Sequence, residues 1–135
     1  GMSTTAFEKI ASDWIKTARH PKFNKPYTEL VYQPMLEVLA YLRANRDHVV
    51  ARVRSDLPGV AVHPPEATYL AWLDFRATAF ADDPAASLVE HAKVGLNDGA
   101  SFGEAGRGFA RLNFATSRAV VDEALDRIAA ALARA

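Results

Sequence analysis

An arginine and an asparagine lie on one face of a short alternating segment, where they could bind an anion. Phe109, Arg111 and Asn113 alternate with Ala110, Leu112 and Phe114, a pattern typical of a half-buried strand. A guanidinium group offers paired donors that match the two oxygens of a carboxylate. The segment therefore predicts a strand over 109–114 on which the donors of Arg111 match those that a carboxylate needs. The alternative is an arginine that forms a surface ion pair or stays solvated.

A glycine-rich segment precedes this strand. Gly99, Gly103, Gly106 and Gly108 could be taken for a phosphate-binding loop. Their spacing matches neither GxGxxG nor GxxxxGK[ST], and a strand rather than a helix follows, so no helix N-terminus is available to bind a phosphate. The spacing favours a turn-rich loop.

Several kinds of reactive site are excluded by residue type. The chain has no cysteine, which excludes disulfides, thiolate zinc sites and a thiol nucleophile. The histidines occur singly, with no paired ligand motif and no adjacent nucleophile: His20, His48, His63 and His91. The acidic pair Asp82-Asp83 is interpreted as the start of a helix rather than as metal ligands. The sequence thus predicts no catalytic residue, no cofactor-binding residue and no metal site.

Two helices are predicted in the first part of the chain. Apolar residues recur at three- and four-residue steps after a Thr5-x-x-Glu8 capping box, which predicts a helix. Its apolar face holds Phe7, Ile10, Trp14 and Ile15. A long helix over 34–57 follows, opened by Pro34 and ended by the turn at Leu57-Pro58-Gly59. Its apolar stripe holds Met35, Leu39, Leu42, Val49 and Val53.

Short strands and two further helices are predicted in the rest of the chain. Strands are expected from Val60 and over 68–75, 94–96 and 109–114. A short helix begins at Asp83 or Pro84, and the last helix begins after a cap at Thr116 or Ser117. The stripe of this last helix holds Val121, Leu125, Ile128 and Leu132.

This order of elements predicts an α+β fold. We expect a two-layer sandwich, in which a small, mainly antiparallel sheet carries helices on one face and is preceded by an N-terminal helical arm. The arm is expected to cover residues 1–33 and the small domain residues 34–135, with the helix over 34–57 spanning the join.

Length and charge narrow the classes of function. The chain has 135 residues, half of them hydrophobic, and its 16 Lys and Arg balance 16 Asp and Glu. This size suits one core rather than two catalytic domains. A net charge of zero gives no long-range attraction to nucleic acid or to an anionic membrane. No run of apolar residues approaches the length of a membrane span, and we expect a cytoplasmic protein without nucleic-acid or membrane partners.

Three segments of the chain resemble a known family. They are PPEATYLAWLD at 64–74, KVGLNDG at 93–99 and GFARLNFA at 108–115. Together they resemble the C-terminal small domain of fold-type I pyridoxal-phosphate (PLP) enzymes, in the class I/II aminotransferases of the cystathionine beta-lyase (C-S lyase) branch. The resemblance covers residues 46–135. It implies that Arg111 binds the α-carboxylate of an amino acid and that the rim of a ligand groove is formed by Tyr69, Asn113, Gly99 and Gly103.

The resemblance also implies that a large part of the family's site lies outside these residues. The family's chemistry depends on a Schiff-base lysine, a carboxylate for the pyridinium nitrogen and phosphate-binding groups, all in a large domain. The five lysines here are Lys9, Lys16, Lys22, Lys25 and Lys93, and none matches the family's catalytic lysine. We therefore expect a domain that holds no PLP by itself and is inactive alone, although it resembles an aminotransferase or cystathionine beta-lyase.

A shorter resemblance concerns the N-terminal third. WIKTARHP at 14–21 and VYQPMLEVL at 31–39 are similar to the cap and following helix of phosphoserine-phosphatase-like haloacid dehalogenase (HAD) hydrolases, over residues 4–45. The DxDx[TV] nucleophile motif of that family is absent. Both resemblances meet between Leu36 and Asn45, which suggests a truncated or chimeric reading frame.

Three functions remain open from the sequence. The preferred one is an isolated, non-catalytic small domain that binds an amino-acid α-carboxylate weakly. The second is an interaction or oligomerisation module that complements a separate PLP-binding large domain, or that forms a homodimer through the N-terminal helix. The third is a fragment of a HAD-type phosphatase fused by chance.

Overall fold

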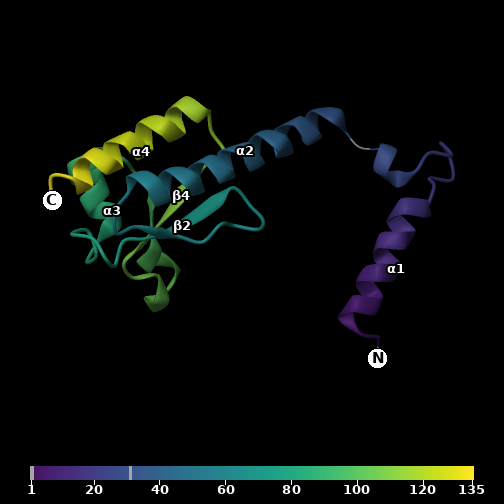
Figure 1. The fold of residues 1–135 in the computed structure, drawn as a ribbon, viewed down its shortest axis with the longest axis horizontal. Coiled ribbons are helices and arrows are strands. Elements are labelled where there is room, and N and C mark those ends of the chain that lie inside the picture. Colours follow the sequence, from purple (N-terminus) through teal and green to yellow (C-terminus); the bar gives the residue numbers. More distant parts are fainter. Residues whose placement is uncertain (1, 31) are drawn as a thin grey trace. The chain divides into compact units, whose positions relative to one another are not determined.

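The computed structural model describes residues 2–30 and 32–135 of the chain. These residues form two compact units, Gly1–Ala40 and Tyr41–Ala135. Figure 1 shows the helices and strands of each unit along the chain. The long helix α2 (Gln33–Asp56) contributes residues to both units. Whether residue 34 begins a domain, as the sequence predicts, stays a prediction.

The first unit contains α1 (Thr4–Thr17) and the 3₁₀ turn η1 (Tyr27–Glu29). The predicted capping box at Thr5 is wrong, because Ser3 is the N-cap and its Oγ accepts a hydrogen bond from the Ala6 amide at 3.2 Å. Serine caps somewhat better than threonine, and the earlier start adds two helical residues, Thr4 and Thr5. The Trp14 ring stacks on Tyr27 with centroids 5.5 Å apart, which ties η1 to the end of α1.

Helix α2 has nearly the predicted bounds. Pro34 lies in its first turn, and Gly59 reverses the chain just beyond its end with a positive φ of 83°. A Cβ at Gly59 would lie 2.6 Å from the Ala77 oxygen, so a side chain does not fit there. Val49 and Val53 of the predicted stripe are fully buried, whereas Met35 and Leu39, which belong to the first unit, are exposed.

A four-stranded antiparallel sheet forms the centre of the second unit, with strand order β1-β2-β4-β3. Its strands are β1 (Ala61–Val62), β2 (Leu70–Asp74), β3 (Asn97–Asp98) and β4 (Phe109–Asn113). Helices α2 and α4 (Arg118–Leu132) lie over one face of this sheet in Figure 1. The predicted α+β two-layer sandwich is thus confirmed.

Two elements before the last strand differ from the prediction. The strand expected over 94–96 is wrong, because β3 lies at Asn97–Asp98, where it pairs with β4. The short helix α3 (Pro84–Ser87) passes into a π-helical turn, η2 (Leu88–Ala92), which ends at Lys93 in the left-handed conformation. Residues 94–96 connect this turn to β3, which pairs with β4.

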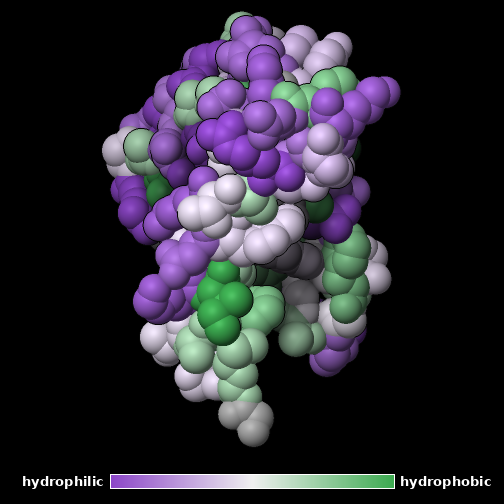
Figure 2. All heavy atoms as spheres, turned by 90° about the vertical axis from the view of Figure 1, so that its right-hand side faces the viewer, coloured by the Kyte–Doolittle hydropathy of each residue, from purple (hydrophilic) through white to green (hydrophobic). Residues whose placement is uncertain are grey.

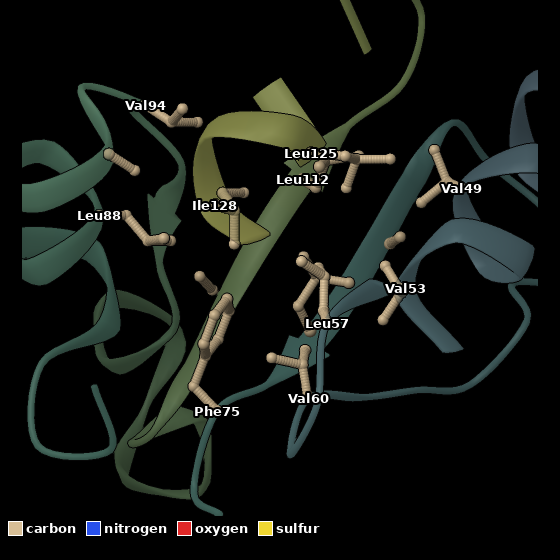
Figure 3. Close-up of a cluster of buried hydrophobic side chains, with 14 of the residues drawn as sticks. Val49, Val53, Leu57, Val60, Phe75, Leu88, Val94, Leu112, Leu125 and Ile128 are labelled. Carbon is tan, nitrogen blue, oxygen red and sulfur yellow. The ribbon is translucent and has the colours of Figure 1, made fainter. Parts of the chain in front are cut away.

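The core lies between the helices and the sheet. Side chains from α2, α4, β4 and the loops converge there in Figure 3. Ala71 and Leu73 of β2 and Ala110 and Leu112 of β4 face this core, as the alternation predicts. Three predicted positions of α4, Val121, Leu125 and Ile128, are also buried in it. The alternate residues of both strands therefore face away from the helices.

Candidate functional site

Arg111 lies in the middle of β4, on the sheet face that points away from the helices. Its cross-strand partners are Trp72 of β2 and Asn97 of β3. The residues before and after it, Ala110 and Leu112, are buried in the core, so the pleat directs Arg111 to the opposite face. The strand predicted for this candidate residue is therefore confirmed, and its role as a carboxylate-binding residue stays a prediction.

The guanidinium group of Arg111 is held on two sides. Its Cζ lies 4.2 Å from the centroid of the Phe102 ring, within the range of a cation–π contact. Its Nη2 donates to the Oδ1 of Asn97 at 3.3 Å. Its Nε is buried and has no hydrogen-bond partner among the described residues. Nε and Nη2 share one edge of the planar group, so this edge has two donors and one acceptor.

Aromatic side chains surround Arg111. The ring of Trp72 meets Phe102 edge to face with centroids 5.4 Å apart, and meets Phe109 at 6.2 Å. A hollow of about 260 Å³ opens beside these rings, lined by Trp72, Phe102, Ala105, Gly106 and Phe109. Phe102 therefore lines the hollow and covers the guanidinium group of Arg111 at the same time.

A second arginine lies further along the same face and is neutralised. Arg76 binds Asp74 through two hydrogen bonds, Nε to Oδ1 at 2.9 Å and Nη2 to Oδ2 at 2.8 Å, and lies 4.8 Å from the centroid of Phe109. These bonds lower the pKa of Asp74 and raise the pKa of Arg76. A second hollow, of about 320 Å³, adjoins this pair and is lined by Ala61, Val62, His63, Trp72, Asp74 and Phe109.

The glycine-rich loop packs by backbone contact. It forms two 3₁₀ turns, η3 (Gly99–Phe102) and η4 (Glu104–Gly106). Gly99 is buried, and a Cβ there would lie 2.3 Å from the Gly106 oxygen. Gly103, with φ of 121°, ends η3 directly after Phe102. Of the two glycines predicted on a groove rim, Gly99 holds the loop together from inside and Gly103 is exposed next to Phe102.

The other two predicted rim residues, Tyr69 and Asn113, accept hydrogen bonds from main-chain amides. Tyr69 is exposed just before β2, and its main-chain oxygen accepts from the Phe114 amide at 2.9 Å. Asn113 uses its Oδ1 to accept from the Ala115 amide at 2.8 Å. Both residues lie near the end of β4 that leads to α4.

Asn97 and Phe102 contact Arg111 and were not predicted from the sequence. The strand expected over 94–96 stops before Asn97, and its pairing with Arg111 follows from the sheet register rather than from any local pattern. Phe102 is one apolar residue among glycines, and only the folded loop brings it onto Arg111. Trp72 could have been found, because it alternates with the buried Ala71 and Leu73 of a predicted strand.

The side chains on this face do not suit PLP as a resident cofactor. The hollows beside Arg111 are lined by aromatic, small and acidic residues and by His63, without a lysine. Lys93 is the one lysine of the Tyr41–Ala135 unit. Its Nζ donates to the Glu90 oxygen at 2.8 Å, at the end of η2. The amine of Lys93 is thus bound at the end of η2 and does not line either hollow.

The described residues show neither a metal site nor a membrane span. Within residues 2–30 and 32–135, no three His, Asp or Glu side chains gather closely enough to hold a metal ion. No helix of the same residues has both the length and the apolar character needed to cross a bilayer.

The part of the chain that curated relatives match is about as long as the Tyr41–Ala135 unit. A cystathionine beta-lyase of Corynebacterium glutamicum is 46% identical in an alignment of 99 positions that covers 71% of this chain and 25% of that protein. The cystathionine beta-lyase PatB of Bacillus subtilis is 37% identical over 97 residues, again 71% of this chain and 25% of the relative. The chain therefore spans about a quarter of the length of these relatives. No family model matches the chain.

Solved structures show the same relationship. A crystal structure described as a PLP-dependent beta-cystathionase from Corynebacterium diphtheriae is 38% identical, with a TM-score of 0.71, and the match covers 93% of this chain and 36% of that one. Cystalysin from Treponema denticola, solved with PLP, is 28% identical with a TM-score of 0.69, over 76% of this chain and 26% of its own.

These similarities agree with the residues that carry the first resemblance and give no support to the second. The relatives and solved structures described above belong to the family whose C-terminal small domain the sequence resembles over residues 46–135. The HAD-type resemblance of residues 4–45 is not supported by them. The chain carries the C-terminal small domain of the PLP-dependent cystathionine beta-lyase and aminotransferase family.

Proposed function

We propose that the Tyr41–Ala135 unit supplies a binding site for the α-carboxylate of an amino acid, with Arg111 as the binding residue. The observation that carries this proposal is the buried Nε of Arg111, which has no partner among the described residues. A buried donor without an acceptor costs about 1–3 kcal/mol. A carboxylate bound side-on would accept from Nε and Nη2 together.

The unit alone is proposed to be a binding domain without catalysis. In its relatives the cofactor chemistry is that of whole proteins about four times the matched length, and the face around Arg111 presents no lysine. When PLP is bound in an intact enzyme, it withdraws electrons from the amino acid, and the arginine holds and orients the carboxylate of that amino acid. Binding by one arginine should be weak, with a Kd of about 1–10 mM.

A titration of the full chain with propionate tests this proposal. We expect a saturable NMR shift of the Arg111 Nε–Hε signal, because two charge-assisted hydrogen bonds form at that edge. The shift should be absent in Arg111→Met and unchanged in Arg127→Met, which alters an exposed arginine of α4 paired with Glu123. No shift at Arg111 up to about 50 mM, well above the expected Kd, would reject the proposal.

A second candidate function is complementation of a separate PLP-binding large domain. It is supported by the aromatic sheet face, since Trp72 and Phe102 are 39% and 51% exposed. Large exposed aromatic groups are enriched in protein interfaces. The test is co-purification with the N-terminal three quarters of the Corynebacterium glutamicum relative. Loss of the complex in Trp72→Ala would support this function, and no complex with the unaltered chain would reject it.

A homodimer through α1 is the remaining partner proposal. The apolar side chains of α1 are exposed: Phe7, Ile10, Trp14 and Ile15. Figure 2 shows such hydrophobic side chains in green among hydrophilic ones on the surface. Sedimentation at about 100 μM protein, where mass action favours even a weak dimer, should show a dimer that Trp14→Ala disrupts. A monomer at that concentration contradicts this proposal.

A further inference from the structure

The edge of Arg111 that carries Nε and Nη2 is only half satisfied. The Oδ1 of Asn97 accepts from Nη2 at 3.3 Å, a long hydrogen bond, and leaves Nε without a partner. An amide oxygen is one acceptor, whereas a carboxylate presents two oxygens at the spacing of the two donors. Asn97 is exposed and can turn away when a carboxylate displaces it.

An apolar hollow lies beside Phe102, the ring that covers the guanidinium group of Arg111. Phe102 packs against the guanidinium group at 4.2 Å and also lines the hollow of about 260 Å³. The rings of Trp72 and Phe109 line the same hollow, together with the small residues Ala105 and Gly106. A group attached to a carboxylate at Arg111 would therefore enter an aromatic environment in which a ring gains both burial and edge contacts.

The same face is unsuited to a second negative charge. The next cation along it, Arg76, is already bound by both oxygens of Asp74. Asp74, already paired with Arg76, lines the adjoining hollow and offers no positive charge to a second carboxylate there. A dicarboxylate would thus bind through one end only, with its other charge placed among aromatic rings.

We infer that the Arg111 site takes a monocarboxylate that carries an apolar group of about the size of an aromatic ring. The carboxylate binds Nε and Nη2 in place of Asn97, and the apolar group fills the hollow between Phe102, Trp72 and Phe109. This inference rests on the proposed function of Arg111 and adds the class of ligand to it.

The test compares three probes on the full chain: 3-phenylpropionate, propionate and succinate. Shifts of the Arg111 Nε–Hε signal and of the Trp72 indole N–H report on the two halves of the site. We expect 3-phenylpropionate to bind about tenfold more tightly than propionate, because partial burial of a ring contributes about that factor. Succinate should bind no more tightly than propionate.

Each outcome separates this inference from the proposed function. If propionate and 3-phenylpropionate bind Arg111 equally, or if succinate binds best, the ligand class is wrong while Arg111 remains a carboxylate-binding residue. If none of the three shifts the Arg111 signal, the proposed function and the ligand class are both rejected.

A pair of variants tests the hollow without altering Arg111. Ala105→Leu fills part of the hollow, so the tenfold preference for 3-phenylpropionate over propionate should disappear. Ala100→Leu is the matched control, because Ala100 is exposed in η3 and does not line the hollow. A preference that persists in Ala105→Leu would place the apolar group elsewhere and overturn the inference.

Discussion

The buried side-chain amide of Asn45 donates a hydrogen bond to the main-chain oxygen of Phe114 at 3.0 Å, across 69 positions in the sequence. The same Nδ2 donates to the Thr116 oxygen at 2.9 Å, and Oδ1 accepts from Arg118 Nε at 2.9 Å. Nearby, the Tyr41 hydroxyl accepts from the Arg118 amide at 2.8 Å. Helix α2 thus holds the link between β4 and α4 through Tyr41 and Asn45.

We expect Asn45→Ala to lower the free energy of unfolding by about 2–4 kcal/mol, because it removes three hydrogen bonds at a fully buried position. Urea denaturation followed by circular dichroism measures this loss. Arg43→Ala, at an exposed position of the same helix, is the control and should change the value by less than about 0.5 kcal/mol. Equal losses in both variants would mean that helix propensity, not the Asn45 network, accounts for the effect.

A second link between α2 and α4 makes the free energy of unfolding fall at acid pH. His48 binds Asp122, which lowers the pKa of Asp122 below its ordinary value of 3.8, and Arg52 lies 3.0 Å from the same carboxylate. A carboxylate with a lowered pKa in the folded state stabilises the fold above its unfolded pKa, and this contribution is lost as the pH falls through the folded value.

Asp122→Asn should therefore lower the free energy of unfolding at pH 7 and flatten its decline below pH 4, since the removed group no longer takes up a proton on unfolding. Urea denaturation at a series of pH values from 2 to 7 gives both quantities. Asp47→Asn removes a carboxylate that is 68% exposed and serves as the control for charge alone. If the free energy of unfolding of Asp122→Asn declines below pH 4 as steeply as that of the unaltered chain, the assigned cause of the pKa shift is wrong.

Local signals predicted most of the small domain, and long-range contacts account for what was missed. Ser117 caps α4, and Phe109–Asn113 forms the alternating strand, because both depend on neighbouring residues. Strand β3 was placed too early, since the pairing of Asn97 with Arg111 depends on the register of β4. The Phe102 contact and the unpartnered Nε of Arg111 arise from how the glycine loop folds back, which no spacing of residues reveals.

The close backbone contact of Gly99 with Gly106 and Phe109 in the glycine-rich loop can be tested directly. Gly99→Ala would place a Cβ 2.3 Å from the Gly106 oxygen and 2.5 Å from the Phe109 oxygen. We expect a loss of about 2–4 kcal/mol, because two backbone segments must move apart. Gly95→Ala is the matched control, since a Cβ there meets no atom within 4 Å. If Gly99→Ala is as stable as Gly95→Ala, the loop does not pack as the structure has it.

In the absence of ligand, Arg111 should lower the free energy of unfolding of the chain. Arg111→Met keeps an apolar stem against Phe102 and removes the buried Nε that has no partner among the described residues. The lost cation–π contact contributes about 0.5–1 kcal/mol, and the long, exposed hydrogen bond to Asn97 adds little to it. The unsatisfied donor costs about 1–3 kcal/mol, and the thioether recovers part of the ring contact. We therefore expect the free energy of unfolding to rise by about 0.5–1 kcal/mol while carboxylate binding is lost, a trade typical of functional residues.

Urea denaturation without added carboxylate measures this difference, and Arg127→Met controls for the loss of one positive charge, because Arg127 is exposed on α4. In the unaltered chain, a saturating carboxylate should in turn raise the free energy of unfolding, since a ligand that binds only the folded state stabilises it. A loss of more than about 1 kcal/mol in Arg111→Met would show that its contacts with Asn97 and Phe102 outweigh the unpaired donor. Arg111 would then be a structural residue of the sheet, and the proposed site would lose its main support.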